Sequence, residues 1–242
     1  MTSLSTMPWL RHPESADPAV RLLCLPHAGA GAASFTRWLG LFPPYIAAVR
    51  VQLPGREDAA AQPPVRRVRD AVAALLPQTA PLLDRPLALY GHSMGALLAY
   101  ELAHTLTEAG TPPAHLFVSG RRAPDRVAGS APIHRLPDQA FLAALQDMGG
   151  TGGPPAFLRY ALPLIRADLE LSEEYDYRPR PGLPIPITAF YGTEDPIVDR
   201  DDIENWRAHT AAAFTLHVMP GDHFFHQRHR IRIAADISEA LR

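Results

Sequence analysis

The sequence predicts an α/β protein with a mostly parallel central sheet flanked by helices and a helical insertion. Three observations predict this fold class. Short apolar runs recur along the 242 residues, as expected for strands buried on both faces. Segments with helical periodicity separate most of these runs, which is typical of parallel α/β sheets. Between residues 121 and 185 this alternation stops, and no clear strand-like run occurs.

The predicted strands are apolar runs bounded by glycine, proline or polar residues. Most of their positions are apolar, rather than every second one, and this indicates burial on both sides of the sheet. The runs lie at residues 20–26, 46–54, 86–91, 115–120, 187–192 and 214–221.

Helices are predicted between these runs. Residues 94–109 are apolar nearly all round until Glu101, which indicates a central, buried helix. An earlier helix is predicted because aliphatic side chains recur on one helical face, with arginines and Asp70 off it. These aliphatic residues are Val65, Val68, Val72 and Leu75.

The segment 121–185 is predicted to be a lid over one end of the sheet, within a single domain that spans residues 1–242. Two helix-like stretches, at 137–148 and 157–175, are joined by glycines and prolines at 149–155. Such a linker would let the two helices move against each other. A static helical cover is the alternative that the sequence leaves open.

Composition excludes several classes of function. Apolar residues make up 47% and the net charge is −2, so a globular protein is expected, without an electrostatic basis for binding nucleic acid or an anionic membrane. All 23 basic residues are arginine, which excludes phosphate loops, Schiff-base enzymes and reductases that need a lysine. Cys24 is the one cysteine and is predicted to be a buried, inert thiol.

The N-terminus lacks the apolar core of a signal peptide, and no uncharged apolar run is long enough to cross a bilayer. These two observations predict a soluble, cytoplasmic protein.

Ser93 is the candidate nucleophile. Residues 91–95 are Gly-His-Ser-Met-Gly, between a strand-like run and a helix-like run. A Gly-x-Ser-x-Gly sequence in this context forms a nucleophile elbow, which holds the serine hydroxyl clear of the sheet. Gly91 and Gly95 would leave room where the strand and the helix nearly touch. The competing interpretation is that the glycines serve packing alone.

A serine hydroxyl needs a base to accept its proton and a carboxylate to orient that base. In α/β-hydrolase sheets the chain order is serine, acid, histidine. Asp195 and His223 follow two predicted strands in that order, at the same sheet edge as Ser93. The rival acids are Glu194, Asp199, Asp201 and Asp202. The last three are expected to begin a helix, where acidic side chains interact favourably with the helix dipole.

Two further histidines, His226 and His229, compete with His223 for the role of base. Together the three have a spacing of i, i+3 and i+6, which raises the alternative of a metal site. They do not share one tight helical face, and neither a cysteine nor an HExxH sequence accompanies them. The sequence therefore predicts a site without metal or cofactor.

The glycine-rich loop after the predicted strand at residues 20–26 has two interpretations. Gly29, Gly31 and Ser34 imitate a dinucleotide-binding loop whose last glycine is replaced. That loop type requires an acidic residue at the end of the next strand, where Gln52 and Leu53 stand instead. We favour the second interpretation, in which this loop donates a backbone N–H to an oxyanion hole. Its natural donor is Ala28, and the second donor would be the N–H of Met94.

Several motifs in order resemble one family, the type II thioesterases that accompany modular polyketide and nonribosomal peptide synthases. They are PHAGAGAASF, QLPGRE, GHSMGALLAYELA, SGRRAP, YGTEDP and PGDHFF, and the similarity runs from about Trp9 to the C-terminus. The resemblance implies an α/β-hydrolase fold with a helical lid after the strand that ends near Ser119. The implied site residues are Ser93 as nucleophile, Asp195 as orienting acid, His223 as base, and Ala28 and Met94 as oxyanion donors.

The resemblance also implies the reaction, which is thioester hydrolysis through an acyl-enzyme. The implied substrates are acyl groups on the phosphopantetheine arm of a carrier protein, and the implied role is to clear stalled or wrong groups. A general carboxylesterase or lipase would use the same triad, and a catalytically idle fold that only binds a synthase is a further alternative.

Arg121 and Arg122 begin the insertion. Carrier proteins are commonly acidic, so these arginines are candidate contacts to the partner. The alternative is a structural role, in which they pair acidic residues within the lid.

Overall fold

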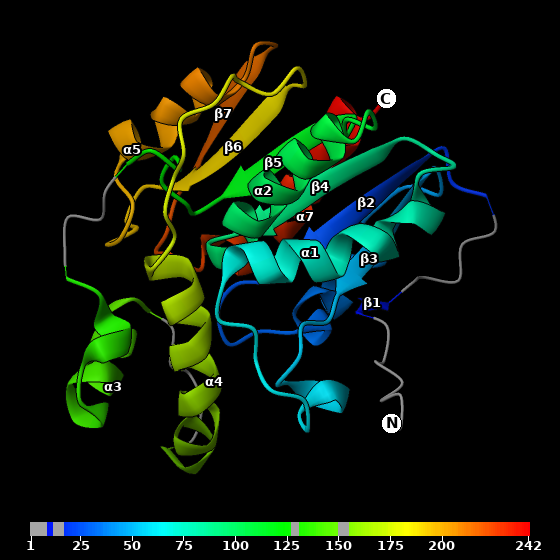
Figure 1. Ribbon diagram of the computed structural model, residues 1–242. Coiled ribbons are helices and arrows are strands. Elements are labelled where there is room, and N and C mark those ends of the chain that lie inside the picture. The colour runs from blue at the N-terminus through cyan, green and yellow to red at the C-terminus, as the bar shows by residue number, and fades with distance from the viewer. Residues whose placement is uncertain (1–8, 12–16, 127–130, 150–154) are drawn as a thin grey trace.

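A seven-stranded sheet lies at the centre of the protein, in the order β1-β3-β2-β4-β5-β6-β7 (Figure 1). The computed structural model describes residues 9–11, 17–126, 131–149 and 155–242. All neighbouring strands run parallel except β1 and β3, which are antiparallel. Because β3 lies on one side of β2 and β4 on the other, the strand order reverses at β2. Ligand sites of open α/β sheets lie at the carboxyl ends of the strands beside such a reversal.

The predicted strands are confirmed, with small differences at their ends. The run 46–54 is shorter than predicted, because the chain leaves the sheet after Val51. The two-residue strand β1 was not predicted, since so short a segment carries no periodicity. The strands are β1 (Leu10–Arg11), β2 (Val20–Leu25), β3 (Ile46–Val51), β4 (Leu87–His92), β5 (His115–Ser119), β6 (Ile187–Gly192) and β7 (Phe214–Met219).

The predicted helices are also present, although the first begins later than expected. Val65 lies outside the helix that starts at Val68, because the chain after Pro63 and Pro64 is still extended at Arg67 (φ −136°, ψ 136°). The helices are α1 (Val68–Thr79), α2 (Met94–Glu108), α3 (Asp138–Asp147), α4 (Pro155–Glu173), α5 (Arg200–Glu204), α6 (Phe225–Arg228) and α7 (Arg230–Ala240).

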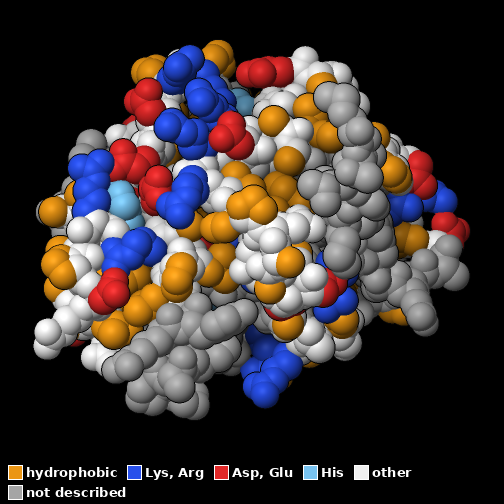
Figure 2. Space-filling model, turned by 60° about the horizontal axis from the view of Figure 1, so that its bottom comes forward, with side chains coloured by type: hydrophobic (Ala, Val, Ile, Leu, Met, Phe, Trp, Pro, Cys, Tyr) orange, Lys and Arg blue, Asp and Glu red, His pale blue; other side chains and the backbone are white. Residues whose placement is uncertain are grey.

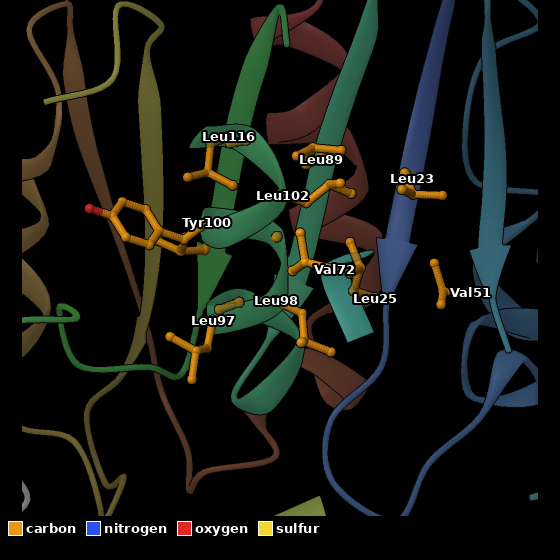
Figure 3. Close-up of a cluster of buried hydrophobic side chains, with 14 of the residues drawn as sticks. Leu23, Leu25, Val51, Val72, Leu89, Leu97, Leu98, Tyr100, Leu102 and Leu116 are labelled. Carbon is orange, nitrogen blue, oxygen red and sulfur yellow. The ribbon is translucent and has the colours of Figure 1, made fainter. Parts of the chain in front are cut away.

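Both faces of the sheet are buried, as the apolar runs predict. On β2, the fully buried side chains of Leu23 and Leu25 enter the cluster that also contains α1 and α2 (Figure 3). Their neighbours Leu22 and Cys24 enter the cluster on the opposite face, which includes α7. Successive side chains of a strand point to opposite faces, so the fully buried part of this strand, Leu22–Leu25, is apolar at every position. Burial raises the pKa of the Cys24 thiol, consistent with the predicted inert thiol.

The segment between β5 and β6 supplies α3 and α4, which lie beyond the carboxyl ends of the strands (Figure 1). Its described residues form no strand, only a single bridge at Leu183. The two helices have their own apolar cluster, and Ala28 from the loop after β2 packs against it. The linker residues 150–154 lie outside the described residues. The described helices include none that is long and apolar enough to cross a membrane.

Candidate active site

Ser93 lies at a strained turn between β4 and α2. Its backbone has φ 53° and ψ −114°, a conformation that residues other than glycine rarely adopt and that is typical of functional sites. Its N–H donates to the Ser119 carbonyl at 2.8 Å. A Cβ on Gly91 would lie 2.1 Å from the Gly95 carbonyl oxygen, and one on Gly95 would lie 2.1 Å from that of Leu25. The predicted elbow is therefore formed, and it requires both glycines.

The side chains of Ser93, His223 and Asp195 form one hydrogen-bonded line. His223 Nε2 lies 3.0 Å from Ser93 Oγ, and His223 Nδ1 lies 2.7 Å from Asp195 Oδ2. A carboxylate only accepts, so Nδ1 carries the proton and Nε2 is free to accept from the serine hydroxyl. The other oxygen, Asp195 Oδ1, accepts from the N–H groups of Ile197 at 2.9 Å and Val198 at 3.3 Å. The structure thus brings together the three residues that the sequence singled out.

The rival acids have other surroundings. Asp199 caps the N-terminus of α5, where its Oδ1 accepts from the Asp202 N–H at 2.7 Å. Glu194 and Asp201 are exposed. In contrast, the Asp195 side chain is 0% exposed and that of its partner His223 is 3% exposed.

The other two C-terminal histidines do not join His223 in a metal site. His226 stacks on His92, with ring centroids 3.7 Å apart, and His229 Nε2 lies 2.9 Å from the Pro220 carbonyl oxygen. In the part of the chain that the structure describes, no group of three or more His, Cys, Asp or Glu residues could hold a metal ion. The absence of a metal from the reaction stays a prediction.

Aromatic rings surround His223, and those of His27, His92 and Phe224 were given no role from the sequence. The His92 ring lies 5.1 Å from that of His223, and the Phe224 ring lies 5.4 Å from it. His27 packs on Phe224 and on His226. Burial lowers the pKa of His27 to about 4, and it lowers the pKa values of His92 and His226 well below their usual range. These rings therefore stay neutral near pH 7 and add no positive charge beside His223.

The two predicted oxyanion donors lie on either side of the elbow. Met94 is the first residue of α2, and Ala28 lies in the loop that leaves β2 beside Gly95. Within the described residues, neither backbone N–H donates to a protein acceptor. Both groups thus lack a protein partner among the described residues, and their role as oxyanion donors stays a prediction.

The loop after β2 is held by side chains that the sequence analysis did not assign a role. Gln52 Oε1 accepts from the Ala32 N–H at 2.7 Å, and Glu57 accepts from the Ala33 N–H at 3.1 Å. Asp168 Oδ2 of α4 accepts from the Gly29 N–H at 2.7 Å. A carboxylate of the chain thus occupies the glycine N–H that a dinucleotide loop would offer to phosphate, which argues against that interpretation. The QLPGRE motif contains the signal, since it supplies Gln52 and Glu57.

Arg121 and Arg122 are both half-buried and form contacts within the protein. Arg121 donates to the Ser172 hydroxyl at 2.5 Å and to the Ser172 carbonyl at 3.2 Å, near the end of α4. Arg122 donates to the Ile197 carbonyl at 2.8 Å. Burial, together with the charge of Arg122, lowers the pKa of Arg121 to about 10. The contacts favour the structural alternative, although with Ser172 and carbonyl groups in place of acids, and the docking role stays a prediction.

Comparison with known proteins decides the family. The family model of the thioesterase domain matches residues 20–241. The chain belongs to the thioesterase family. This thioesterase is 38% identical over 241 residues to thioesterase PikA5 of Streptomyces venezuelae, covering 96% of the chain and 85% of that protein. It is 39% identical to the gramicidin S biosynthesis protein GrsT of Aneurinibacillus migulanus, over 85% of the chain and 82% of that protein.

Solved structures agree with this assignment. The type II thioesterase BorB from the borrelidin biosynthetic cluster is 37% identical, with a TM-score of 0.88 over 98% of this thioesterase and 97% of that chain. The RedJ thioesterase from the prodiginine pathway of Streptomyces coelicolor is 37% identical, with a TM-score of 0.87 over 94% and 95% of the two chains. Likeness over nearly the full length confirms the fold and the type II thioesterase family that the motifs indicate.

Proposed function

We propose that this type II thioesterase hydrolyses acyl thioesters on the phosphopantetheine arm of carrier proteins. Its role is to clear stalled or wrong acyl groups from a polyketide or nonribosomal peptide synthase, and we place it in the cytoplasm. The observation that carries the proposal is the line from Ser93 through His223 to Asp195, with spacings of 3.0 and 2.7 Å, in a chain of the thioesterase family. By their names, BorB belongs to the borrelidin biosynthetic cluster, RedJ to the prodiginine pathway and GrsT to gramicidin S biosynthesis, which supports a role in the biosynthesis of such products.

The first half of the reaction transfers the acyl group to the enzyme. Ser93 Oγ attacks the thioester carbonyl carbon while His223 Nε2 takes the hydroxyl proton. Asp195 stabilises the imidazolium that forms and holds the ring in place. The C–S bond then breaks, and the pantetheine thiol leaves with the proton from His223. The second half repeats these steps with water as the nucleophile and releases the acid.

The negative charge that develops on the carbonyl oxygen needs donors placed in advance. The N–H groups of Ala28 and Met94 supply them, and each is worth about 3 kcal/mol of transition-state stabilisation, as in other oxyanion holes. The first residue of a helix suits this task, because its N–H has no partner within the helix. The N–H of Met94 has such a position on α2.

The lid formed within residues 121–185 governs access to Ser93. Its helices lie beyond the carboxyl ends of the strands, where the elbow is located (Figure 1). Figure 2 shows this side of the molecule, with hydrophobic side chains at the middle and charged side chains of both signs mostly toward the top, the left and the right edge. A second RedJ structure, 38% identical to this chain, holds a polyethylene glycol molecule in the active site. This observation supports a channel that suits a long, thin substrate such as an acyl-phosphopantetheine arm.

The test compares two substrates that carry the same acyl group. We expect kcat/KM to be higher for the acyl-carrier-protein thioester than for the nitrophenyl ester, and Ser93→Ala to abolish both reactions. A preference for the simple ester would favour the carboxylesterase alternative. A wild-type protein that reacts with neither substrate nor a fluorophosphonate probe would favour an idle binding protein.

A further inference from the structure

A buried ion pair connects the loop after β3 to α4 of the lid. Arg56 donates through Nη1 to Asp168 Oδ2 at 2.7 Å and through Nη2 to Asp168 Oδ1 at 2.8 Å. The two side chains are 3% and 1% exposed. A buried pair of this kind stabilises a fold no better than apolar residues of similar volume. The pair is therefore expected to have a role beyond stability, which the other hydrogen bonds of the two side chains indicate.

Both partners also hold the loop that carries Ala28. Asp168 Oδ2 accepts from the Gly29 N–H at 2.7 Å, and Arg56 Nη1 donates to the Ala30 carbonyl at 2.8 Å. The Gly29 N–H belongs to the peptide unit that directly follows Ala28. Fixing that peptide plane restricts the backbone of Ala28, and with it the direction of the Ala28 N–H.

Helix α4 also contacts this loop directly. Gly29 has φ +78°, and a Cβ there would lie 2.8 Å from Ile165 Cγ1 of α4. The Ala28 side chain packs against the apolar cluster of α3 and α4. The loop therefore depends on α4 in two ways, through the carboxylate of Asp168 and through close packing at Gly29.

We propose that Asp168 is a positioning residue of the reaction, which with Arg56 couples the seating of α4 to the direction of the Ala28 N–H. The oxyanion hole is then complete only when Asp168 of α4 is in contact with Arg56 and Gly29. The inference rests on the proposed function, because it assumes that the Ala28 N–H binds the oxyanion. The competing role for Asp168 is to attach the lid without any effect on the chemistry.

The test is Asp168→Asn, with Glu173→Gln as the matched control. Glu173 lies on the same helix and also attaches it through backbone groups, since it accepts from the N–H groups of Ile133 at 3.1 Å and His134 at 3.0 Å. It has no contact with the loop after β2 among the described residues. We expect Asp168→Asn to lower kcat about 10- to 100-fold, the effect of misplacing one group by about 1 Å, with KM changed less than about threefold. The control should keep kcat within about threefold, even if both variants lower the melting temperature.

A second measurement separates positioning from loss of structure. A trifluoromethyl ketone analogue of the substrate adds to Ser93 and places an oxyanion in the hole, whereas an amide analogue does not. Across the variants, the inhibition constant of the ketone should rise in proportion to the loss of kcat/KM, and that of the amide should stay constant. An unchanged kcat in Asp168→Asn, an unchanged ketone constant beside a lower kcat, or an equal loss of kcat in Glu173→Gln would each overturn the proposal.

If Asp168→Asn does not fold, Asp168→Glu takes its place. Glutamate keeps a charge for Arg56 but shifts the acceptor by one methylene relative to the Gly29 N–H. We expect a lower kcat at a melting temperature near that of the wild type, and a wild-type kcat would overturn the inference. Labelling of Ser93 by a fluorophosphonate serves as the independent check. If the probe does not react with Ser93 in the wild type, the proposed function itself fails, whatever the Asp168 variants show.

Discussion

His223 Nδ1 lies 2.7 Å from Asp195 Oδ2, and the two side chains are 3% and 0% exposed. Asparagine at position 195 keeps the size of the side chain, but its amide favours the wrong tautomer of the base. We therefore expect Asp195→Asn to lower kcat about 10⁴-fold. The matched control is Asp199→Asn, which alters the N-cap of α5 and should leave kcat close to the wild-type value. A larger loss in the control than in Asp195→Asn would show that the orienting acid is misassigned.

Ser93→Ala should fold normally and lose turnover by about 10⁴-fold or more, because no other group can form the acyl-enzyme. Removing the hydroxyl also relieves no backbone strain, since φ 53° is required by the turn rather than by the side chain. Circular dichroism and thermal unfolding check the fold, and hydrolysis of the carrier thioester checks the activity. Near wild-type turnover in this variant would exclude Ser93 as the nucleophile. A solved structure of a serine-to-alanine variant of YbtT, a type II thioesterase 28% identical to this chain, indicates that such a change is tolerated in a relative.

The buried histidines beside the site should make the protein less stable in mild acid. Burial, followed by nearby His27 and His223, lowers the pKa of His226, so the folded state stays unprotonated where the unfolded chain takes up a proton. The contribution of each such histidine to the free energy of unfolding is thus fully present above the pKa of histidine in the unfolded chain, about 6.5. Below that pH the free energy of unfolding declines by about 1.4 kcal/mol per pH unit for each such histidine.

Urea unfolding at several pH values between about 7 and 5 measures this decline. His226→Phe keeps a ring to stack on His92 and removes one titrating group. The free energy of unfolding of the variant should therefore fall less steeply as the pH is lowered, because its unfolding takes up about one proton fewer. A slope equal to that of the wild type would mean that His226 is not held neutral in the folded state.

Chelation should leave the enzyme active. His223 hydrogen-bonds to Ser93 and Asp195, and His226 stacks on His92, so the C-terminal histidines have partners that need no metal. We expect full hydrolysis of the carrier thioester after dialysis against EDTA. Loss of activity that zinc restores would require a metal in the mechanism.

Arg121 and Arg122 can be tested for both of their possible roles with one double variant, Arg121→Ala with Arg122→Ala. A docking role predicts that only the carrier-protein substrate suffers, and that its rate in the wild type falls with added salt. The contacts of Arg121 with Ser172 and of Arg122 with Ile197 predict instead a lower melting temperature and a similar loss on a short acyl-pantetheine. We expect the second result, and a loss confined to the carrier substrate would establish docking.

The elements of this fold could be predicted from the sequence because the signals for them are local. A strand buried on both faces must be apolar at successive positions, as in Leu22, Leu23, Cys24 and Leu25. The elbow likewise needs two glycines at a set spacing from Ser93, whatever surrounds it. The meeting of Ser93, Asp195 and His223 could be predicted although Ser93 and His223 are 130 residues apart, because parallel strands bring their carboxyl ends to one edge.

Only the tertiary structure decided that Arg56 and Asp168 together hold the loop of Ala28. Arg56 and Asp168 are 112 residues apart, and Asp168 lies on a helix whose apolar pattern gives no reason to select one acid from its neighbours. The partner of a buried charge is fixed by how a helix packs on a loop, and no periodicity or spacing in the chain records that contact. The same limit applies to His226, whose stacking on His92 arises only when α6 packs against the end of β4.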